Sequence, residues 1–262
     1  MVRSPPPCSI KNAPRFVSLR SAQARKIALD VLEELADIKN IDHLAEQKAA
    51  FGVGGMLQLA QTDNKLIKKL ACESIAEDVW AHEGKKGEIR ELGGCEVLVG
   101  IVGDKNNDDE VLLPALWAVR NIAHGSAENK KELGRLGSIK ILVDICEAVK
   151  AGSGIGNSNE REPIMESALT ALVNLVVDDE TNCRKLLKFG LDALIDIAEE
   201  YGGGPQSKGG GGESQKQSNG ALATSLLVML GPYNFLVCAN CGKEQPGGTS
   251  CMQCGHAISF AS

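Results

Sequence analysis

Four cysteines near the end of the printed chain have the residue type and spacing that best fit a chemical role. The stretch "CANCGKEQPGGTSCMQCG" spans residues 238–255 and contains two Cys-x-x-Cys pairs, each followed by glycine. Four thiolates with this spacing can close a tetrahedron around one zinc ion, which leaves no coordination position open for catalysis. We therefore expect one structural zinc ion, Zn2+, with four ligands: Cys238, Cys241, Cys251 and Cys254.

The same stretch resembles a known type of small metal module. "VCANCGKEQPGGTSCMQCGHAI" is similar to the two-knuckle zinc-ribbon family over nearly its whole length. Gly242 and Gly255 follow the cysteine pairs, where a residue free to adopt positive φ lets backbone N–H groups turn toward the sulfurs. A thioredoxin-type redox pair would need a βαβ context, and a RING-type module would need eight ligands. We expect a zinc-ribbon module over residues 232–262.

Four of the other five cysteines form a different class. Cys72, Cys95, Cys146 and Cys183 are scattered through segments with helical apolar periodicity. Such cysteines behave as small buried hydrophobic residues. No secretory signal precedes them, so the sequence does not favour a disulfide framework.

Composition narrows the class of protein. Charged residues make up 24%, apolar residues 43% and aromatic residues only 3% of the 262 residues, and the net charge is −6. A core with so few aromatic rings must be built from aliphatic side chains, which favours packing of helix on helix. A net negative charge is not typical of a nucleic-acid binder. The longest apolar run is interrupted at Gly231 and Pro232, so no segment reaches transmembrane length.

The N-terminal residues have a strongly basic composition. No acid precedes Asp30, whereas six basic residues do: Arg3, Lys11, Arg15, Arg20, Arg25 and Lys26. This composition fits a disordered basic tail, which we assign to residues 1–21, and it also fits an organelle presequence. We expect a cytoplasmic or nuclear location, with organelle import as the alternative.

The central part of the chain repeats itself. Gly93 precedes Gly137 by 44 residues, and an independent pair, Ala71 and Ala115, has the same separation. A step of 53 residues then leads from Ala115 to Ala168 and from Gly137 to Gly190. A period of this length, with three helical patterns in each unit, is typical of armadillo-type arrays. Four units are predicted, at about residues 43–81, 85–124, 128–177 and 180–230, with an extra helix before them.

The stretch "ALWAVRNIAHGSAENKKELGRLGSIKILVDI" resembles the armadillo repeats of β-catenin and importin-α. The resemblance covers residues 22–230 and implies an all-α, right-handed superhelical solenoid of about four three-helix repeats. Two segments rich in Gly, Ser and Gln, at residues 151–162 and 202–218, are expected to be flexible insertions between second and third helices.

In that family the third helices line a concave groove, where Trp and Asn hold an extended peptide. Trp117 and Asn121 match these positions, and Asn174 matches the second position of the next unit while Thr170 replaces the tryptophan. Acidic residues occupy the corresponding positions of earlier units. The candidate groove set comprises Trp117, Asn121, Asn174, Arg120, Glu73, Glu77, Asp30 and Glu34. The alternatives are that the acids form a solvated helix face and that Trp117 and Asn121 serve the array itself.

The sequence favours a non-catalytic scaffold or adaptor. No nucleophile-elbow or phosphate-loop pattern occurs in it, and the four histidines lie in separate segments. We expect the partner to be another protein or an extended, basic peptide, and not a nucleic acid, a membrane or a small-molecule substrate. The alternative function is a ubiquitin-pathway or nucleic-acid-associated adaptor that recruits its partner through the zinc ribbon.

Overall fold

The fold is taken from a computed structural model, which describes residues 52–153, 155, 160–201, 211–233, 235–237 and 244–246. The predicted tail at residues 1–21 lies outside this part of the chain. The same is true of two predicted groove residues, Asp30 and Glu34, and of the four predicted zinc ligands.

Short helices joined by tight turns account for most of the described residues. A helix at residues 52–59 comes first. The helices that follow are α3 (Lys65–Ala81), α4 (Lys85–Glu91), α5 (Gly94–Gly103), α6 (Asp109–Ala123), α7 (Ala127–Arg135), α8 (Ser138–Lys150), α9 (Arg161–Val176), α10 (Glu180–Tyr201) and α11 (Gly211–Leu230). After α11 come the 3₁₀ turn η1 (Gly231–Tyr233) and two strands, β1 (Phe235–Val237) and β2 (Glu244–Pro246).

Local sequence signals set several of the helix boundaries. The Asn64 side chain accepts hydrogen bonds from the backbone N–H groups of Leu66 and Ile67, which caps the start of α3. Gly93 and Gly137 have φ values of 74° and 83°, and each links a short first helix to the next helix of its unit. This left-handed conformation carries a steric cost for any residue with a Cβ atom, so glycine suits both positions.

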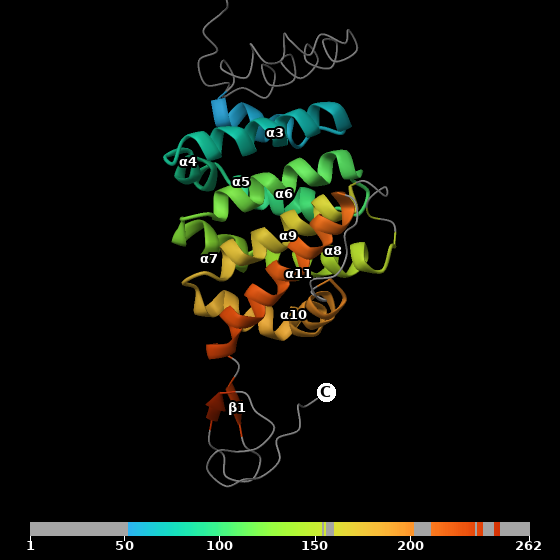
Figure 1. Cartoon of the computed structure of the whole chain (residues 1–262). Coiled ribbons are helices and arrows are strands. Elements are labelled where there is room, and N and C mark those ends of the chain that lie inside the picture. The colour runs from blue at the N-terminus through green and yellow to red at the C-terminus, as the bar shows by residue number, and fades with distance from the viewer. Residues whose placement is uncertain are drawn as a thin grey trace, which may run out of the picture.

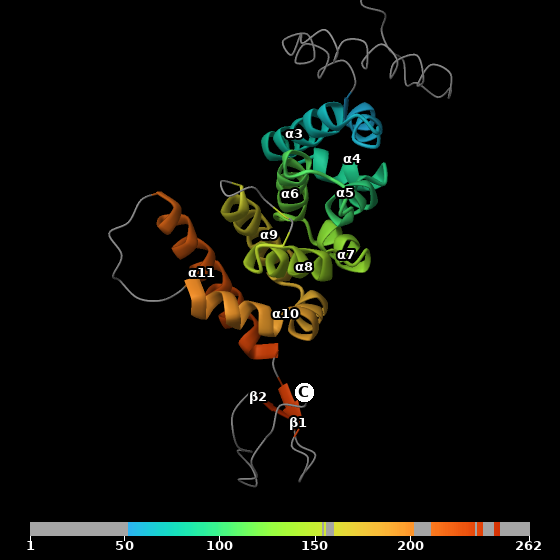
Figure 2. The ribbon, with the colours of Figure 1, turned by 90° about the vertical axis from the view of Figure 1, so that its right-hand side faces the viewer.

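The helices stack in one direction from α3 to α11 (Figure 1). Helix α3 packs on α6, α6 on α9, and α9 on α11. These four helices are the third helices of successive units, and they follow one another along one side of the stack, with α4, α5 and α7 on the other side (Figure 2). We call the surface that they form the third-helix face. The structure confirms the predicted all-helical array of armadillo type.

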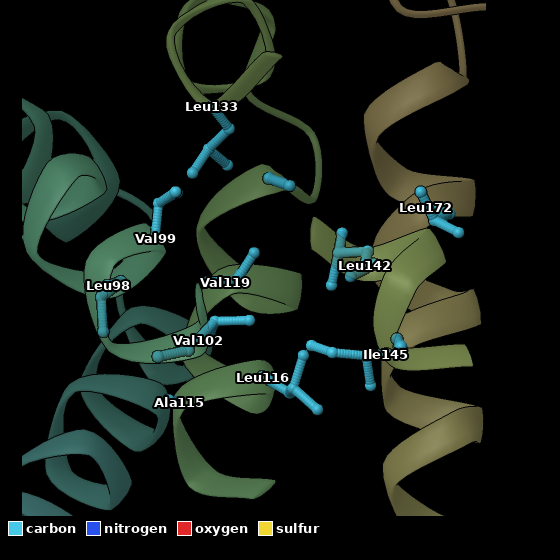
Figure 3. Packing of buried hydrophobic residues seen from close by; sticks show 14 of the residues in the cluster. Leu98, Val99, Val102, Ala115, Leu116, Val119, Leu133, Leu142, Ile145 and Leu172 are labelled. Atoms are coloured by element: carbon cyan, nitrogen blue, oxygen red, sulfur yellow. The ribbon is translucent and has the colours of Figure 1, made fainter. Parts of the chain in front are cut away.

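A single aliphatic core runs through the stack. Side chains from α5, α6, α7, α8 and α9 gather in one region between the helices, with Leu116 of α6 and Leu142 of α8 at its centre (Figure 3). Both of these leucines are fully buried. Because each unit buries its apolar face against the next, the stack is stabilised mainly by interfaces between neighbouring units.

Helix α10 differs from the prediction of separate first and second helices in every unit. It runs through Gly190 without interruption, and Gly190 does not adopt positive φ. A Cβ atom at this position would lie 2.7 Å from a methyl group of Val143 on α8. Gly190 is therefore required for the close approach of α10 to α8, whereas the glycines at 93 and 137 are required for turns.

Helix α11 corrects the predicted boundary of the second insertion. The expected flexible segment, residues 202–218, was to precede a helix, yet α11 already begins at Gly211. Two polar contacts connect the N-terminal half of α11 to α9. The Gln215 side chain donates to Glu166 (2.9 Å), and the Asn219 amide donates to the carboxylate of Glu162 (2.9 Å). The first insertion, residues 151–162, falls between α8 and α9 except for its last two residues, which begin α9.

The C-terminal strands form a small antiparallel hairpin after the array. Phe235 pairs with Pro246 and Val237 pairs with Glu244. The connection between the strands comprises residues 238–243, which include two of the four predicted zinc ligands. Within the part of the chain that the structure describes, no helix has the length and apolar character needed to span a membrane.

Candidate functional site

A pocket of about 490 Å³ opens on the third-helix face between α3 and α6. Helix α3 supplies Glu73, Ala76, Glu77 and Trp80, and α6 supplies Trp117, Arg120 and Asn121. The helical repeat explains why these residues meet. Glu73, Glu77 and Trp80 are spaced by four and three residues and so share one face of α3. The opposite face of α3 buries Cys72, Ile75 and Val79 in the core, and this contact fixes the rotation of the helix.

The pocket contains both tryptophans of the chain. Trp80 is 71% exposed and Trp117 is 37% exposed, although tryptophan is usually well buried. The Trp80 ring lies next to the His124 imidazole, at 6.2 Å between centroids. Two indole rings held at the surface of a chain so poor in aromatic residues form an apolar contact surface with a polar edge.

The Asn121 side chain is bonded within the array. It is buried, and its Nδ2 donates to the Ala76 carbonyl of α3 at 2.9 Å. Its Oδ1 accepts from Nε of Arg120 at 3.4 Å. Asn174 makes the equivalent contact one unit later, where its Nδ2 donates to the Arg120 carbonyl at 3.0 Å. These two amides connect successive third helices, and a role for them in holding a peptide stays a prediction.

The charges around the pocket have mixed sign. Glu73 is half-buried and Glu77 is exposed, and both lie on α3. Arg120 is half-buried on α6 and is the cationic residue that lines the pocket. The two carboxylates outnumber the guanidinium, so the pocket favours a cationic group over an anionic one.

The structure brings together five of the eight predicted groove residues. Glu73, Glu77, Trp117, Arg120 and Asn121 line the pocket. Asn174 is half-buried on α9, the next third helix. The remaining two residues lie outside the described part of the chain.

Sequence reasoning missed Trp80. The repeat alignment compared equivalent positions only, and Trp80 is not equivalent to Trp117. A signal was nevertheless present, because Trp80 lies seven residues after Glu73, which places both on one helical face two turns apart.

A second pair of buried amides was also missed. Asn129 donates from Nδ2 to the carbonyls of Lys86 (3.1 Å) and Ile122 (3.0 Å). Asn182 donates in the same way to Lys130 (3.1 Å) and Leu175 (3.0 Å). The two asparagines are separated by 53 residues, the same step that relates Gly137 to Gly190. Each amide therefore ties the first helix of a unit to two helices that pack against it.

Lysine side chains repeat a related contact at the helix ends. Nζ of Lys86 donates to the His124 carbonyl at 2.7 Å, and Nζ of Lys130 donates to the Val177 carbonyl at 2.8 Å. Each acceptor closes the C-terminal end of a third helix, where carbonyl groups lack helical partners and a cation is favourable. These lysines therefore hold the ends of α6 and α9.

The cysteines of the array show no sign of chemical activity. Burial raises the pKa of the Cys72 and Cys146 thiols to about 12 and that of the Cys95 and Cys183 thiols to about 11. Thiols with raised pKa values are poor nucleophiles at neutral pH. Among the described residues, no group of three or more potential metal ligands converges on one point.

Comparisons with known proteins agree with this geometry. Residues 82–124, which contain α4, α5 and α6, match the Armadillo/beta-catenin-like repeat family. A designed armadillo repeat protein, YIII(Dq)4CqI, superimposes with a TM-score of 0.52 at 21% identity, over 72% of this chain and 69% of that one. An engineered protein, target OR329, gives a TM-score of 0.52 at 22% identity, over 67% of this chain and 62% of that one. No curated protein matches the chain.

The two solved structures show the fold alone, because their sequences are less than 25% identical to this chain. The family match covers a single unit of the array. Taken together, these findings show that the chain carries an armadillo repeat and has an armadillo-type fold.

Proposed function

We propose that this chain is a non-catalytic scaffold that holds a partner protein, through an extended segment of it, on the third-helix face. The observation that carries the proposal is the pocket between α3 and α6, where both tryptophans of the chain are exposed next to two carboxylates. Exposed aromatic side chains beside a hollow mark binding surfaces, because their burial on contact releases a large apolar area from water.

Charge favours a basic segment at the α3 end of this face. Glu73 and Glu77 attract a lysine or arginine, and opposite charge acts chiefly on encounter rate and register. Farther along, the half-buried residues Thr170, Val173 and Asn174 of α9 are uncharged. A segment that is basic at one end and neutral at the other therefore fits the face best.

The test uses three fluorescently labelled peptides of equal length, one basic, one neutral and one acidic, titrated against the full chain by anisotropy. We expect the basic peptide to bind most tightly and its affinity to fall with added salt, as for a charge-steered contact. Changing both Trp80→Ala and Trp117→Ala should weaken its binding by about tenfold or more.

Phe189→Ala provides the matched control, since Phe189 is an exposed aromatic residue of α10 that lies outside the pocket. It should leave peptide binding unchanged. Circular dichroism will establish that the tryptophan variant is folded. Equal affinities for the basic and acidic peptides, or full binding by the folded tryptophan variant, would show that this face is not the binding site.

The C-terminal hairpin supports a structural zinc module as part of the proposed scaffold. Residues 238–243 join β1 to β2, and they place Cys238 and Cys241 in a six-residue connection between paired strands. We expect these two thiolates, three residues apart in sequence, to bind the same metal ion. Cys251 and Cys254 would supply the remaining ligands of a closed tetrahedral site.

The zinc proposal predicts about one zinc ion per chain in metal analysis of the purified protein. Changing Cys238→Ser together with Cys241→Ser should remove that zinc, whereas Cys146→Ser, in the array, should retain it. Zinc bound at full occupancy by the Cys238/Cys241 variant would contradict the ligand assignment. Titrating the basic peptide with and without a chelator, and with a chain that lacks residues 232–262, will show whether the array alone holds the peptide.

A further inference from the structure

The pocket between α3 and α6 draws its two indole rings from different helices and from positions that are not equivalent in the repeat. Trp80 lies near the end of α3, and Trp117 lies in the middle of α6. Trp80 is 71% exposed and Trp117 is 37% exposed, so part of each residue that lines the pocket is accessible to a bound group. Tryptophan is the aromatic residue that attracts a cation most strongly over its face.

The buried polar groups of the pocket already have partners. The Ala76 carbonyl accepts from Asn121, and Oδ1 of Asn121 accepts from Arg120. Ala76 and Asn121 are only 4% and 6% exposed. An unmodified lysine ammonium is a compact, strongly hydrated charge with three N–H donors, and it would lose water here without gaining a new acceptor from these buried groups.

A quaternary ammonium group avoids this cost because it has no N–H donor. Its charge is spread over methyl groups that can pack on indole rings, and the ring faces attract that charge. Glu73 and Glu77 attract any cation, and only the unmodified ammonium can donate hydrogen bonds to them. Glu73 is half-buried and Glu77 is exposed, so such a bond replaces one to water and adds little net affinity.

From these observations we propose that the pocket accepts a quaternary ammonium group, in the form of a trimethylated lysine side chain carried by the bound segment. The proposal rests on the proposed function and names the side chain that the pocket selects. Arg120 opposes it electrostatically, since its guanidinium lines the same pocket. Arg120→Gln should therefore strengthen binding of the quaternary group.

The two tryptophans make a direct experiment available. Since the chain contains no others, a ¹⁵N-labelled sample should give two indole N–H signals, and both report on this pocket. One peptide is titrated in three forms, with a central lysine that is unmodified, trimethylated, or replaced by the neutral analogue in which carbon takes the place of the quaternary nitrogen. Tetramethylammonium chloride alone is a fourth probe.

We expect both indole signals to shift in a saturable way with the trimethylated peptide. Its affinity should exceed that of the unmodified and neutral peptides by about tenfold or more. Trp80→Ala and Trp117→Ala should each weaken binding, Trp80→Phe should restore part of it, and Phe189→Ala should have no effect. If tetramethylammonium binds as tightly as the peptide, the peptide adds no affinity, and the assignment to a lysine side chain is overturned in favour of a free quaternary ammonium compound.

An unmodified or neutral peptide that binds as tightly as the trimethylated one would overturn the inference, and so would indole signals that none of the four probes moves. The proposed function has its own readout. If the basic peptide binds and the double tryptophan variant loses it, the scaffold proposal stands even when methylation adds no affinity.

Discussion

Trp80 and Trp117 are exposed because the core fixes which faces of α3 and α6 point outward. Ile75 and Val79 are buried on the inner face of α3, so Trp80, on the other side of the helix, faces the pocket. Asn121 differs from the tryptophans, because its side-chain amide donates a hydrogen bond to the Ala76 carbonyl of α3. At the residue scale, the surface that we propose for a partner is therefore aromatic and acidic, and the amides contribute to holding the helices together.

Trp117 and Asn121 were identified from the sequence because the stretch around them resembles armadillo repeats, and Asn174 because it lies 53 residues after Asn121. Trp80 and the hydrogen-bond partners of Asn121 were not, because a repeat alignment compares equivalent positions and does not show which side chains of neighbouring helices meet.

The buried thiols make the stability of the array depend on pH in a defined direction. Burial raises the pKa of Cys146 from the ordinary value of 9.0 to about 12 in the folded chain. Below pH 9 both states keep the proton. Between pH 9 and 12 the unfolded state releases it first, so this group favours unfolding increasingly as pH rises.

We therefore expect the denaturation midpoint to fall between pH 8 and pH 10 by a larger amount in the parent chain than in Cys146→Ala. Urea titrations at the two pH values measure the difference. An equal fall in both proteins would show that the Cys146 thiol does not contribute to this pH dependence.

At the scale of the helices, glycine spacing predicts turns only where the glycine is not needed for packing. Gly137 and Gly190 are related by the same step as other repeat positions, yet one ends a helix and the other lies inside α10. Contact with Val143 decides the second case, and such a contact between distant segments leaves no local signal in the sequence. The early start of α11 has the same origin, since the residue that Gln215 contacts, Glu166, is on α9.

We expect the loss of a buried amide between helices to destabilise the array more than the loss of an exposed ion pair. Asn182→Ala removes two hydrogen bonds to carbonyls on different helices and should lower the free energy of unfolding by about 1–3 kcal/mol. Arg184→Ala removes an exposed ion pair with Glu180 on the same helix and should cost less than about 1 kcal/mol. Urea denaturation followed by circular dichroism compares the two, and equal losses would contradict the assigned role of Asn182.

At the scale of the whole molecule, the repeat step predicted the architecture because a solenoid is built from contacts between neighbouring units. The armadillo-type array and the order of its helices follow from that step and from aliphatic periodicity. The surface proposed for a partner depends on where non-equivalent side chains of α3 and α6 meet, and the repeat pattern in the sequence does not contain that information.

The central claim is that the α3–α6 part of the third-helix face selects a basic segment. The most direct measurement is the ratio of affinities for the basic and acidic peptides, compared between the parent chain and the variant with Glu73→Gln and Glu77→Gln. Our account predicts a ratio well above one in the parent chain and a fall of about tenfold in the variant, with both proteins folded. An unchanged ratio would contradict it, because the selectivity would then arise elsewhere on the molecule.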